Sequence, residues 1–185
     1  MSKVLVFGHQ NPDNDAVMSA VVLAQLLNQV EFNGCTYEAR ALGPLPAESA
    51  KLLADAGLPE PMLLDAIEPA AEGEDPQQVI LTDHNEPGQS VAGLANAQIV
   101  GVVDHHRFGD FTTAAPLTIV AMPWGSSCTV VAKLFEVLGQ ELTDTQAKLL
   151  LSAMMTDTLM LKSPTTTDVD RATAAKLGEQ LGVDP

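Results

Sequence analysis

Basic and aromatic residues are scarce in this sequence. Only 9 of the 185 residues are Lys or Arg, against 24 Asp or Glu, and the formal net charge is -15. This charge removes the long-range attraction to phosphate backbones on which most nucleic-acid-binding proteins depend, so we expect no general nucleic-acid binding. Aromatic residues make up 4% of the chain, whereas 46% of it is hydrophobic. Length and composition therefore indicate one globular α/β domain with a sizeable core.

Cysteine and long apolar runs are also in short supply. The two cysteines, Cys35 and Cys128, lie far apart and form no CxxC pair, so we expect reduced thiols in a packed interior. The apolar run at the start of the chain is too short for a secretory signal, and no later run is long enough to span a bilayer. These absences predict a cytoplasmic protein that does not associate with a membrane.

Short apolar segments alternate with helical patterns along the chain. We expect strands at 3–8, 36–42, 79–82, 99–103 and 117–122, and helices at 15–30, 46–57, 126–139, 143–155 and 168–181. Asn14 or Asp15 is expected to cap the first helix, and Pro12 should hold Asn11 in an extended conformation. This alternation predicts an α/β fold with a mostly parallel sheet and helices on both faces.

All four histidines directly follow predicted strands, and each lies close to an aspartate in the sequence. They are His9, His84, His105 and His106. The carboxyl ends of parallel strands meet at one edge of a sheet, so motifs that are distant in the sequence could form one site there.

The first motif is Gly-His-Gln-Asn-Pro-Asp-Asn-Asp, at residues 8–15. It offers three potential metal ligands, His9, Asp13 and Asp15, on a turn that Pro12 constrains. An ordinary helix start with acidic residues near the positive end of the dipole is the alternative, although it leaves His9 unexplained.

The other three motifs carry one or two candidate ligands each. Asp83 follows a buried strand and suits a metal-bridging carboxylate, or equally a strand-end turn. His105 and His106 follow Asp104, an arrangement that suits metal ligation together with orientation of the ligand by its neighbours. Asp157 ends an apolar helix, where the helix dipole disfavours an anion unless a cation lies nearby.

Carboxylates mixed with imidazoles suit Mn²⁺, and also Mg²⁺, Co²⁺ or Zn²⁺. Two divalent ions can activate water and stabilise an in-line phosphoryl displacement, yet they only neutralise the four aspartates, Asp13, Asp15, Asp83 and Asp157. A polyanionic substrate needs further positive charge, and only Arg107 and Lys162 lie near the motifs in sequence. We therefore expect a further segment, a partner or substrate-bound metal to supply it.

Four segments, GHQNPDND, DHNE, DHH and TDTLMLKSPTTT, spread between Val4 and Thr167, resemble the family II inorganic pyrophosphatases of the DHH phosphoesterase superfamily. The resemblance implies hydrolysis of diphosphate to two orthophosphates with two Mn²⁺ per chain, Co²⁺ or Mg²⁺ as possible substitutes, and Mg²⁺ brought in with the substrate. It further implies that His9 and Asp13 hold one Mn²⁺, that Asp15 and His105 hold the other, and that Asp83 and Asp157 bridge the two. His106 would face the substrate and act in catalysis with Asp83 and Asp157.

Members of that family have two domains, and the second carries a basic substrate-binding motif. The resemblance implies that residues 1–185 form the metal-binding catalytic DHH-type N-terminal domain, without the C-terminal substrate-binding domain, so that turnover by this chain alone is impaired. It also implies a homodimer formed through this domain. Two alternatives stay open. One is another DHH-type phosphoesterase that acts on oligonucleotides, cyclic dinucleotides or polyphosphate, and the other is a metal-binding module without catalytic activity.

Overall fold

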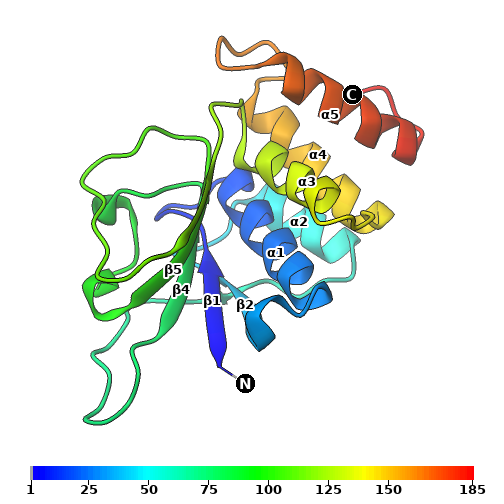
Figure 1. The fold of residues 1–185 in the computed structure, drawn as a ribbon. Coiled ribbons are helices and arrows are strands. Elements are labelled where there is room, and N and C mark those ends of the chain that lie inside the picture. Colours follow the sequence, from blue (N-terminus) through cyan, green and yellow to red (C-terminus); the bar gives the residue numbers. More distant parts are fainter. Residues whose placement is uncertain (1) are drawn as a thin grey trace.

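A computed structural model describes residues 2–185, which form a six-stranded sheet and five α-helices (Figure 1). The strands are β1 (Lys3–Phe7), β2 (Thr36–Ala41), β3 (Met62–Leu63), β4 (Gln78–Thr82), β5 (Gln98–Asp104) and β6 (Thr118–Ala121). The α-helices are α1 (Asn14–Gln29), α2 (Ala47–Asp55), α3 (Ser127–Val137), α4 (Asp144–Asp157) and α5 (Asp168–Leu181), and the 3₁₀-helices are η1 (Phe32–Gly34), η2 (Pro87–Gln89) and η3 (Leu94–Asn96). Every predicted element is present. The sequence analysis missed β3, because two residues are too few to form a pattern.

The sheet has the strand order β3-β2-β1-β4-β5-β6, and all neighbouring strands run parallel. The α/β class and the parallel sheet are thus confirmed. The chain proceeds from β1 outward to β2 and β3, and then crosses to β4 and proceeds outward in the opposite direction. The order therefore reverses between β1 and β4, and at such a point the loops after the two strands diverge and leave a crevice where ligands bind in open α/β sheets.

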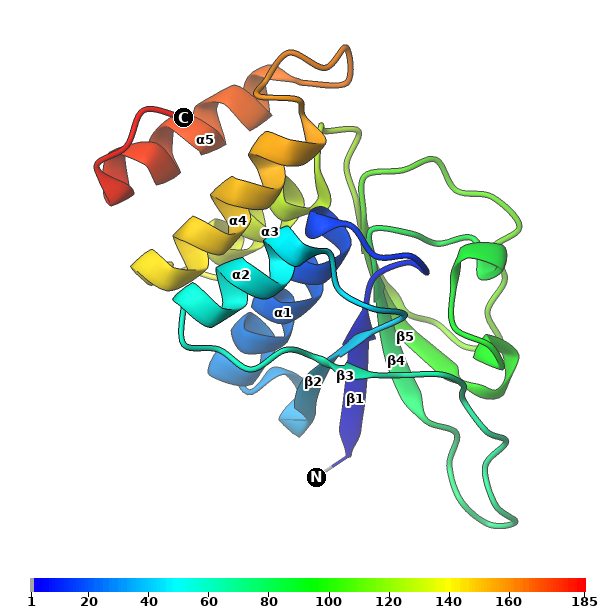
Figure 2. The same ribbon diagram turned by 180° about the vertical axis from the view of Figure 1, so that it is seen from behind.

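The two faces of the sheet are covered differently. Figures 1 and 2 show the five α-helices on one side of the sheet and extended loop segments on the other. We expected helices on both faces, but within residues 2–185 the second face carries only the short η2 and η3. Right-handed crossovers place the β4–β5 and β5–β6 connections on this second face. These connections contain Pro87, Gly88, Gly93 and Gly109, which disfavour an α-helix.

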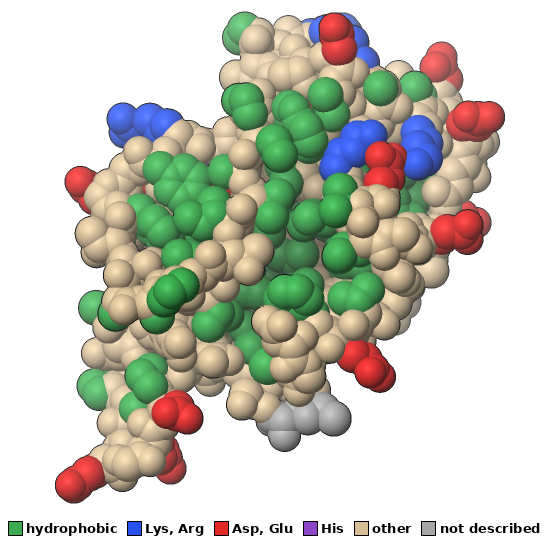
Figure 3. Space-filling view, in the orientation of Figure 1, with side chains coloured by type: hydrophobic (Ala, Val, Ile, Leu, Met, Phe, Trp, Pro, Cys, Tyr) green, Lys and Arg blue, Asp and Glu red, His purple; other side chains and the backbone are tan. Residues whose placement is uncertain are grey.

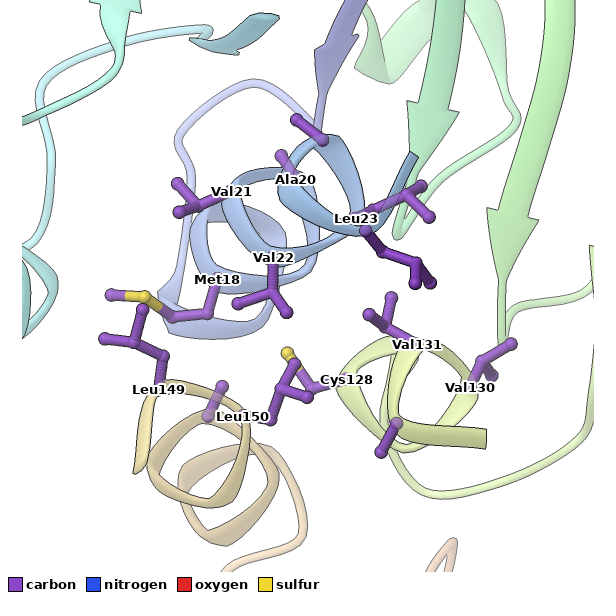
Figure 4. Packing of buried hydrophobic residues seen from close by; sticks show 14 of the residues in the cluster. Met18, Ala20, Val21, Val22, Leu23, Cys128, Val130, Val131, Leu149 and Leu150 are labelled. Atoms are coloured by element: carbon purple, nitrogen blue, oxygen red, sulfur yellow. The ribbon is translucent and has the colours of Figure 1, made fainter. Parts of the chain in front are cut away.

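The main core lies between the sheet and the α-helices, with α1 at its centre. Figure 4 shows Met18 and Val22 of α1 directed toward Leu149 and Leu150 of α4 and toward Cys128 of α3. A smaller core, which includes Phe7 and Leu81, fills the other face beneath the loops. Burying each large side chain contributes roughly 1.5–3 kcal/mol, so α1 is fixed on several sides and provides a rigid support for its first turn.

Hydroxyl side chains cap α3 and α4, and the predicted cap of α1 was wrong by one residue. Ser126 caps α3, and Thr143 caps α4 in a capping box. The cap of α1 is Asp13, one residue before the expected range, and its side chain accepts a hydrogen bond from the backbone N–H of Ala16 at 2.9 Å. The prediction for Asn11 was also wrong, because its φ of +52° lies in the left-handed region that asparagine tolerates.

The surface view in Figure 3 shows hydrophobic side chains over the centre of one face and acidic side chains at its periphery. A groove of about 410 Å³ lies between the sheet and the ends of α1 and α3, and residues such as Leu26, Ile80 and Leu134 line it. Cys128 is a buried free thiol, as expected, whereas the free thiol of Cys35 is only partly buried. Among residues 2–185, no helix combines the length and the apolar character that crossing a bilayer requires.

Candidate metal centre

Side chains from five elements meet at the carboxyl edge of the sheet. The loops after β1, β4 and β5 bring His9, Asp83 and His105, the first turn of α1 brings Asp15, and the last residue of α4 brings Asp157. The candidate ligand atoms form three groups, in each of which the atoms lie within 4.8 Å of one another. These groups are His9–Asp13–Asp83, Asp15–His105–Asp157 and Asp83–His105–His106. All the predicted site residues therefore come together in one place.

The group His9–Asp13–Asp83 forms around the imidazole of His9. Its Nε2 lies 3.6 Å from Asp13 Oδ2 and 3.5 Å from Asp83 Oδ2. Asp13 performs two tasks, since its Oδ1 caps α1 while its Oδ2 faces His9. Asp83 is buried and has a φ of +58°, a conformation that directs the chain away from β4 and that aspartate adopts more readily than most residues. We call this group the first ligand set.

The group Asp15–His105–Asp157, the second ligand set, lies deeper in the molecule. His105 Nε2 is 3.7 Å from Asp157 Oδ2 and 3.3 Å from Asp83 Oδ1, so Asp83 faces a histidine of each set. Asp15 is buried, and three donors at the start of α3 fix its carboxylate. These donors are the hydroxyl of Ser126 at 2.6 Å and the backbone N–H groups of Ser127 at 2.7 Å and Cys128 at 3.0 Å.

The hydrogen bonds of the two histidines indicate what lies between the side chains of the site. His9 Nδ1 donates to the carbonyl of Gln10 at 2.8 Å, and His105 Nδ1 donates to the carbonyl of Trp124 at 2.9 Å. In a neutral ring the lone pair of each Nε2 would then face carboxylate oxygens, which is repulsive unless a cation lies between them. The separations of 3.3–3.7 Å exceed a normal hydrogen bond. Two metal bonds of about 2.1 Å would separate the ligand atoms by about 3.0–3.4 Å, close to these values.

The titration behaviour of the site has the same physical cause. The carboxylates of Asp13 and Asp83 beside the ring raise the pKa of His9 to about 11. For His105, burial is the largest single influence and lowers the pKa, but the carboxylates of Asp83 and Asp15 and the carbonyl of Trp124 together raise it to about 10. Burial and the charge of Asp83 raise the pKa of Asp157 to about 6. The site thus attracts positive charge strongly, as expected of carboxylates placed together out of water.

One buried oxygen atom at the site lacks a partner that a bound cation would supply. Asp157 Oδ2 is buried and has no hydrogen-bond partner among residues 2–185. An unpaired buried carboxylate oxygen is costly, because it has lost its hydration without compensation. A divalent cation bound together with His105 would restore the balance, and the mixture of imidazole and carboxylate suits Mn²⁺ or a similar ion. The residues present therefore fit a metal.

His106 differs from the other two histidines because it is half exposed. Its Nδ1 lies 2.9 Å from Asp104 Oδ1, and this hydrogen bond raises the pKa of His106. The same nitrogen is 3.7 Å from Asp83 Oδ1, so His106 could also be counted as a ligand. Since Nδ1 is already engaged with Asp104, we expect the other ring nitrogen, Nε2, to be the one available to bind a molecule or to exchange a proton.

The similarity of this chain to known proteins agrees with this geometry. A family model described as "DHH family, N-terminal domain" matches residues 3–159, which is most of the chain. The chain belongs to the DHH family. The resemblance inferred from the sequence motifs is thereby confirmed, and the histidine pair His105–His106 lies within the matched part of this DHH-family chain.

Two curated relatives match the DHH-family chain along its full length. Each is described as a probable manganese-dependent inorganic pyrophosphatase, and the identity over 184 residues is 42% for the protein from Lactobacillus helveticus and 44% for that from Streptococcus agalactiae. The chain spans only 57% of the length of each of these relatives. They therefore show what the chain resembles, while the activity of the whole protein is a separate question.

Two solved structures share its fold. A Methanococcus jannaschii protein described as a "putative family II inorganic pyrophosphatase" has a TM-score of 0.83 at 36% identity, covering 98% of this chain and 57% of that one. An exopolyphosphatase-related protein from Bacteroides fragilis has a TM-score of 0.72 at 19% identity, covering 99% of this chain and 53% of that one. At that lower identity the likeness shows the fold alone.

Hydrogen bonds from neighbouring residues hold the candidate ligands of the DHH-family site in position. Asp104 is fully buried and accepts hydrogen bonds from the backbone N–H groups of His105 and His106 and from the side chain of Asn85. Ser127 donates its hydroxyl to Asp83 at 3.0 Å. The sequence predicted that the carboxylate beside the histidine pair helps to orient it, and Asp104 does so for the ring of His106. The role of Ser127 was missed, because no local signal connects Ser127 to Asp83.

His84 follows a strand, as predicted, but it does not face the metal ligands. It is buried, and its two ring nitrogens lie 2.8 Å from the carbonyl of Thr82 and 3.0 Å from the hydroxyl of Ser90. Its imidazole therefore ties the end of β4 to the loop that follows η2, and the ring is fully used in this structural role.

The backbone directly after Asp157 is strained. Leu159, Met160 and Leu161 have φ values of +51°, +56° and +59°. Each residue other than glycine costs about 1–2 kcal/mol in this region. Thr158 holds the turn, because its hydroxyl donates to Met154 at 2.6 Å and accepts from the N–H of Leu161 at 3.1 Å. The strain therefore sits beside a ligand of the second set, where backbone strain is often found.

Replacing Met160 with glycine is expected to stabilise the protein by about 0.5–1 kcal/mol, because relief of the left-handed strain exceeds the added entropy of the unfolded chain. Met160 is 56% exposed, so little packing is lost. Urea unfolding measures the change. Val137→Gly is the matched control, since Val137 is 78% exposed but helical, and this variant is expected to lose about 0.5–1 kcal/mol. If Met160→Gly and Val137→Gly lower the free energy of unfolding equally, the backbone at Met160 is not strained.

Proposed function

We propose that this chain is the metal-binding N-terminal part of an enzyme that hydrolyses inorganic diphosphate to two orthophosphates with two Mn²⁺ ions. The observation that carries the proposal is the position of Asp83, whose two oxygens face His9 at 3.5 Å and His105 at 3.3 Å. One carboxylate between two histidine-containing ligand sets is the arrangement that a pair of neighbouring ions needs. The names of the two curated relatives support the choice of manganese and of diphosphate.

The first ligand set would hold one ion through His9 and Asp13, and the second would hold the other through Asp15 and His105, with Asp83 shared. Asp157 was predicted to bridge the ions as well. Its contact with His105 supports a role in the second set, and its bridging role stays a prediction. The replacement of Mn²⁺ by Co²⁺ or Mg²⁺ also stays a prediction, as does the entry of Mg²⁺ with the substrate.

The bound ions would supply Lewis-acid activation of water and of the phosphoryl oxygens. His106 would supply a proton: Asp104 orients its ring through Nδ1, and this hydrogen bond raises the pKa of His106, which favours the protonated imidazole. Nε2 could then donate to the orthophosphate that leaves. Asp83 and Asp157 would complete the catalytic group by holding the site negative enough to retain both ions.

The substrate itself needs more positive charge than the described residues offer. The side chain of Arg107 is 87% exposed and pairs with Glu86 at 3.3 Å, so it is only partly available to an anion. We propose that a basic substrate-binding segment outside residues 1–185 completes the site, as the length of the relatives allows. A homodimer and a cytoplasmic location stay predictions, and the exposed Ile119 on the edge strand β6 is compatible with self-association.

The test is phosphate release from diphosphate by the full protein, with Mn²⁺ added to metal-free enzyme. We expect Mn²⁺-dependent release that exceeds hydrolysis of a dinucleotide, a cyclic dinucleotide or polyphosphate by at least about tenfold, a difference of about 1.4 kcal/mol in activation free energy. A preference for one of the other substrates would make the protein a different DHH-type phosphoesterase. If the protein binds two Mn²⁺ but hydrolyses none of these substrates, it is a metal-binding module without catalytic activity.

A further inference from the structure

We infer that Asp170 is a positioning residue for the second ligand set and acts through the turn Trp124–Gly125–Ser126. Asp170 lies in the first turn of α5, outside the residues 3–159 that the family model matches. The inference rests on the proposed metal function, since it concerns the binding of the ion that Asp15, His105 and Asp157 would share.

Asp170 is a fully buried carboxylate with four hydrogen-bond donors around it. Oδ2 accepts from the N–H of Gly125 at 2.9 Å, from the N–H of Thr167 at 2.7 Å and from the hydroxyl of Thr167 at 2.6 Å. Oδ1 accepts from the hydroxyl of Thr129 at 2.6 Å. These short charge-assisted bonds compensate for burial of the charge, and they tie α5 to α3 and to the turn before it.

The contacts with Thr167 are those of an ordinary capping box, which α5 would use wherever it lay. The bonds to Gly125 and Thr129 are additional, since these residues precede Asp170 by 45 and 41 positions in the chain. Capping alone would not require the carboxylate to be buried against this turn.

The turn that Asp170 holds carries two groups that fix metal ligands. The carbonyl of Trp124 accepts the hydrogen bond of His105 Nδ1 at 2.9 Å and so sets the ring orientation and leaves Nε2 to face the carboxylates. The hydroxyl of Ser126 donates to Asp15 at 2.6 Å. Partners of this kind orient a metal ligand, and removing one typically lowers metal affinity by about 10–100-fold.

The turn is tightly packed around Gly125. A Cβ on Gly125 would lie 2.8 Å from the side chain of Thr158 and 3.0 Å from Asp170 Oδ2. Thr158 directly follows Asp157. The turn therefore lies beside Asp157 as well as contacting Asp15 and His105, the other two members of the second set. Asp170 makes no hydrogen bond to His9, Asp13 or Asp83, and the turn reaches the first set only through the neighbouring Ser127, which donates to Asp83. The effect of Asp170 should therefore be much larger on the second set.

The experiment measures Mn²⁺ affinity by titration calorimetry in the full protein, one ligand set at a time. His9→Ala weakens the first set, so that the second can be titrated, and His105→Ala does the reverse. Adding Asp170→Ala is expected to lower affinity about 10–100-fold in the His9→Ala background and less than about twofold in the His105→Ala background. Asp170→Asn, which keeps the shape and one acceptor oxygen, should restore part of the affinity.

Two control variants separate positioning from general stability. Leu177→Ala removes a buried side chain from the same helix and should destabilise α5 without changing Mn²⁺ affinity, while Asp168→Asn removes an exposed charge from the same first turn. If Asp170→Ala does not fold, Asp170→Asn decides, and unchanged affinity of the second set would overturn the inference. Equal losses in both sets, or an equal loss in Leu177→Ala, would also overturn it. If the wild-type protein binds Mn²⁺ but does not hydrolyse diphosphate, the proposed function is refuted. The effect of the Asp170 variants on Mn²⁺ affinity can still be measured in that case.

Discussion

Asp83→Asn is expected to reduce bound Mn²⁺ from two ions to at most one and to lower diphosphate hydrolysis by roughly 10³-fold or more, since losing even one fixed electrostatic contact in an active site costs roughly 10²–10³. Asp83 faces a histidine of each ligand set and is buried between them. An amide has a single oxygen and no charge, so it cannot serve two ions at once.

Asparagine is the appropriate replacement at this position because the φ of Asp83 is +58°. Asparagine tolerates the left-handed region, whereas alanine would add backbone strain to the loss of the carboxylate. Elemental analysis after dialysis gives the metal content, and phosphate release gives the rate. Asp65→Asn, at an exposed aspartate outside the three groups of candidate ligands, is the control. A variant that retains two Mn²⁺ per chain would show that Asp83 is not shared.

His106→Gln should separate catalysis from metal binding. We expect two bound Mn²⁺ and a turnover number lower by roughly 10²–10⁴-fold, the usual contribution of a general acid or base. The side chain of His106 is 51% exposed, and its Nδ1 is engaged with Asp104, so glutamine removes the proton donor without removing a ligand.

The matched comparison for His106→Gln is His9→Gln, the same chemical change at a histidine of the first ligand set. This second variant should lose metal, and added Mn²⁺ should partly restore its rate, whereas added Mn²⁺ should not restore His106→Gln. Metal content and turnover measured on both proteins give the answer. Loss of metal from His106→Gln would instead make His106 a ligand, as the third group Asp83–His105–His106 permits.

Local patterns predicted the elements well. The strand at residues 3–8 and the helix that follows it are present with ends shifted by about one residue, because short apolar runs and capping residues act through neighbours in the sequence. The errors were also local in origin. Asn11 follows the tolerance of asparagine for left-handed backbone instead of the preference set by Pro12, and Asp13 caps α1 while it also faces His9.

The residues that hold the ligands in position were out of reach of such patterns. Ser126 and Ser127 contact Asp15 across 111 and 112 residues, and Asp170 contacts Gly125 across 45. A serine at the start of a helix predicts a cap, and nothing in its neighbourhood states which carboxylate it will meet. Such pairs depend on how helices pack, which the sequence specifies only through the whole core.

The sequence by itself determined the class of the fold and the set of candidate ligand side chains, since alternation of apolar runs and clustering of His with Asp are properties of short segments. Tertiary structure decided the rest. Reversal of strand order between β1 and β4 brings His9 next to Asp83, and packing of α3 and α4 against α1 brings Asp15 next to His105 and Asp157. The division into two ligand sets that share Asp83 follows from these long-range contacts, because only folding brings such distant charges within a few ångströms of one another.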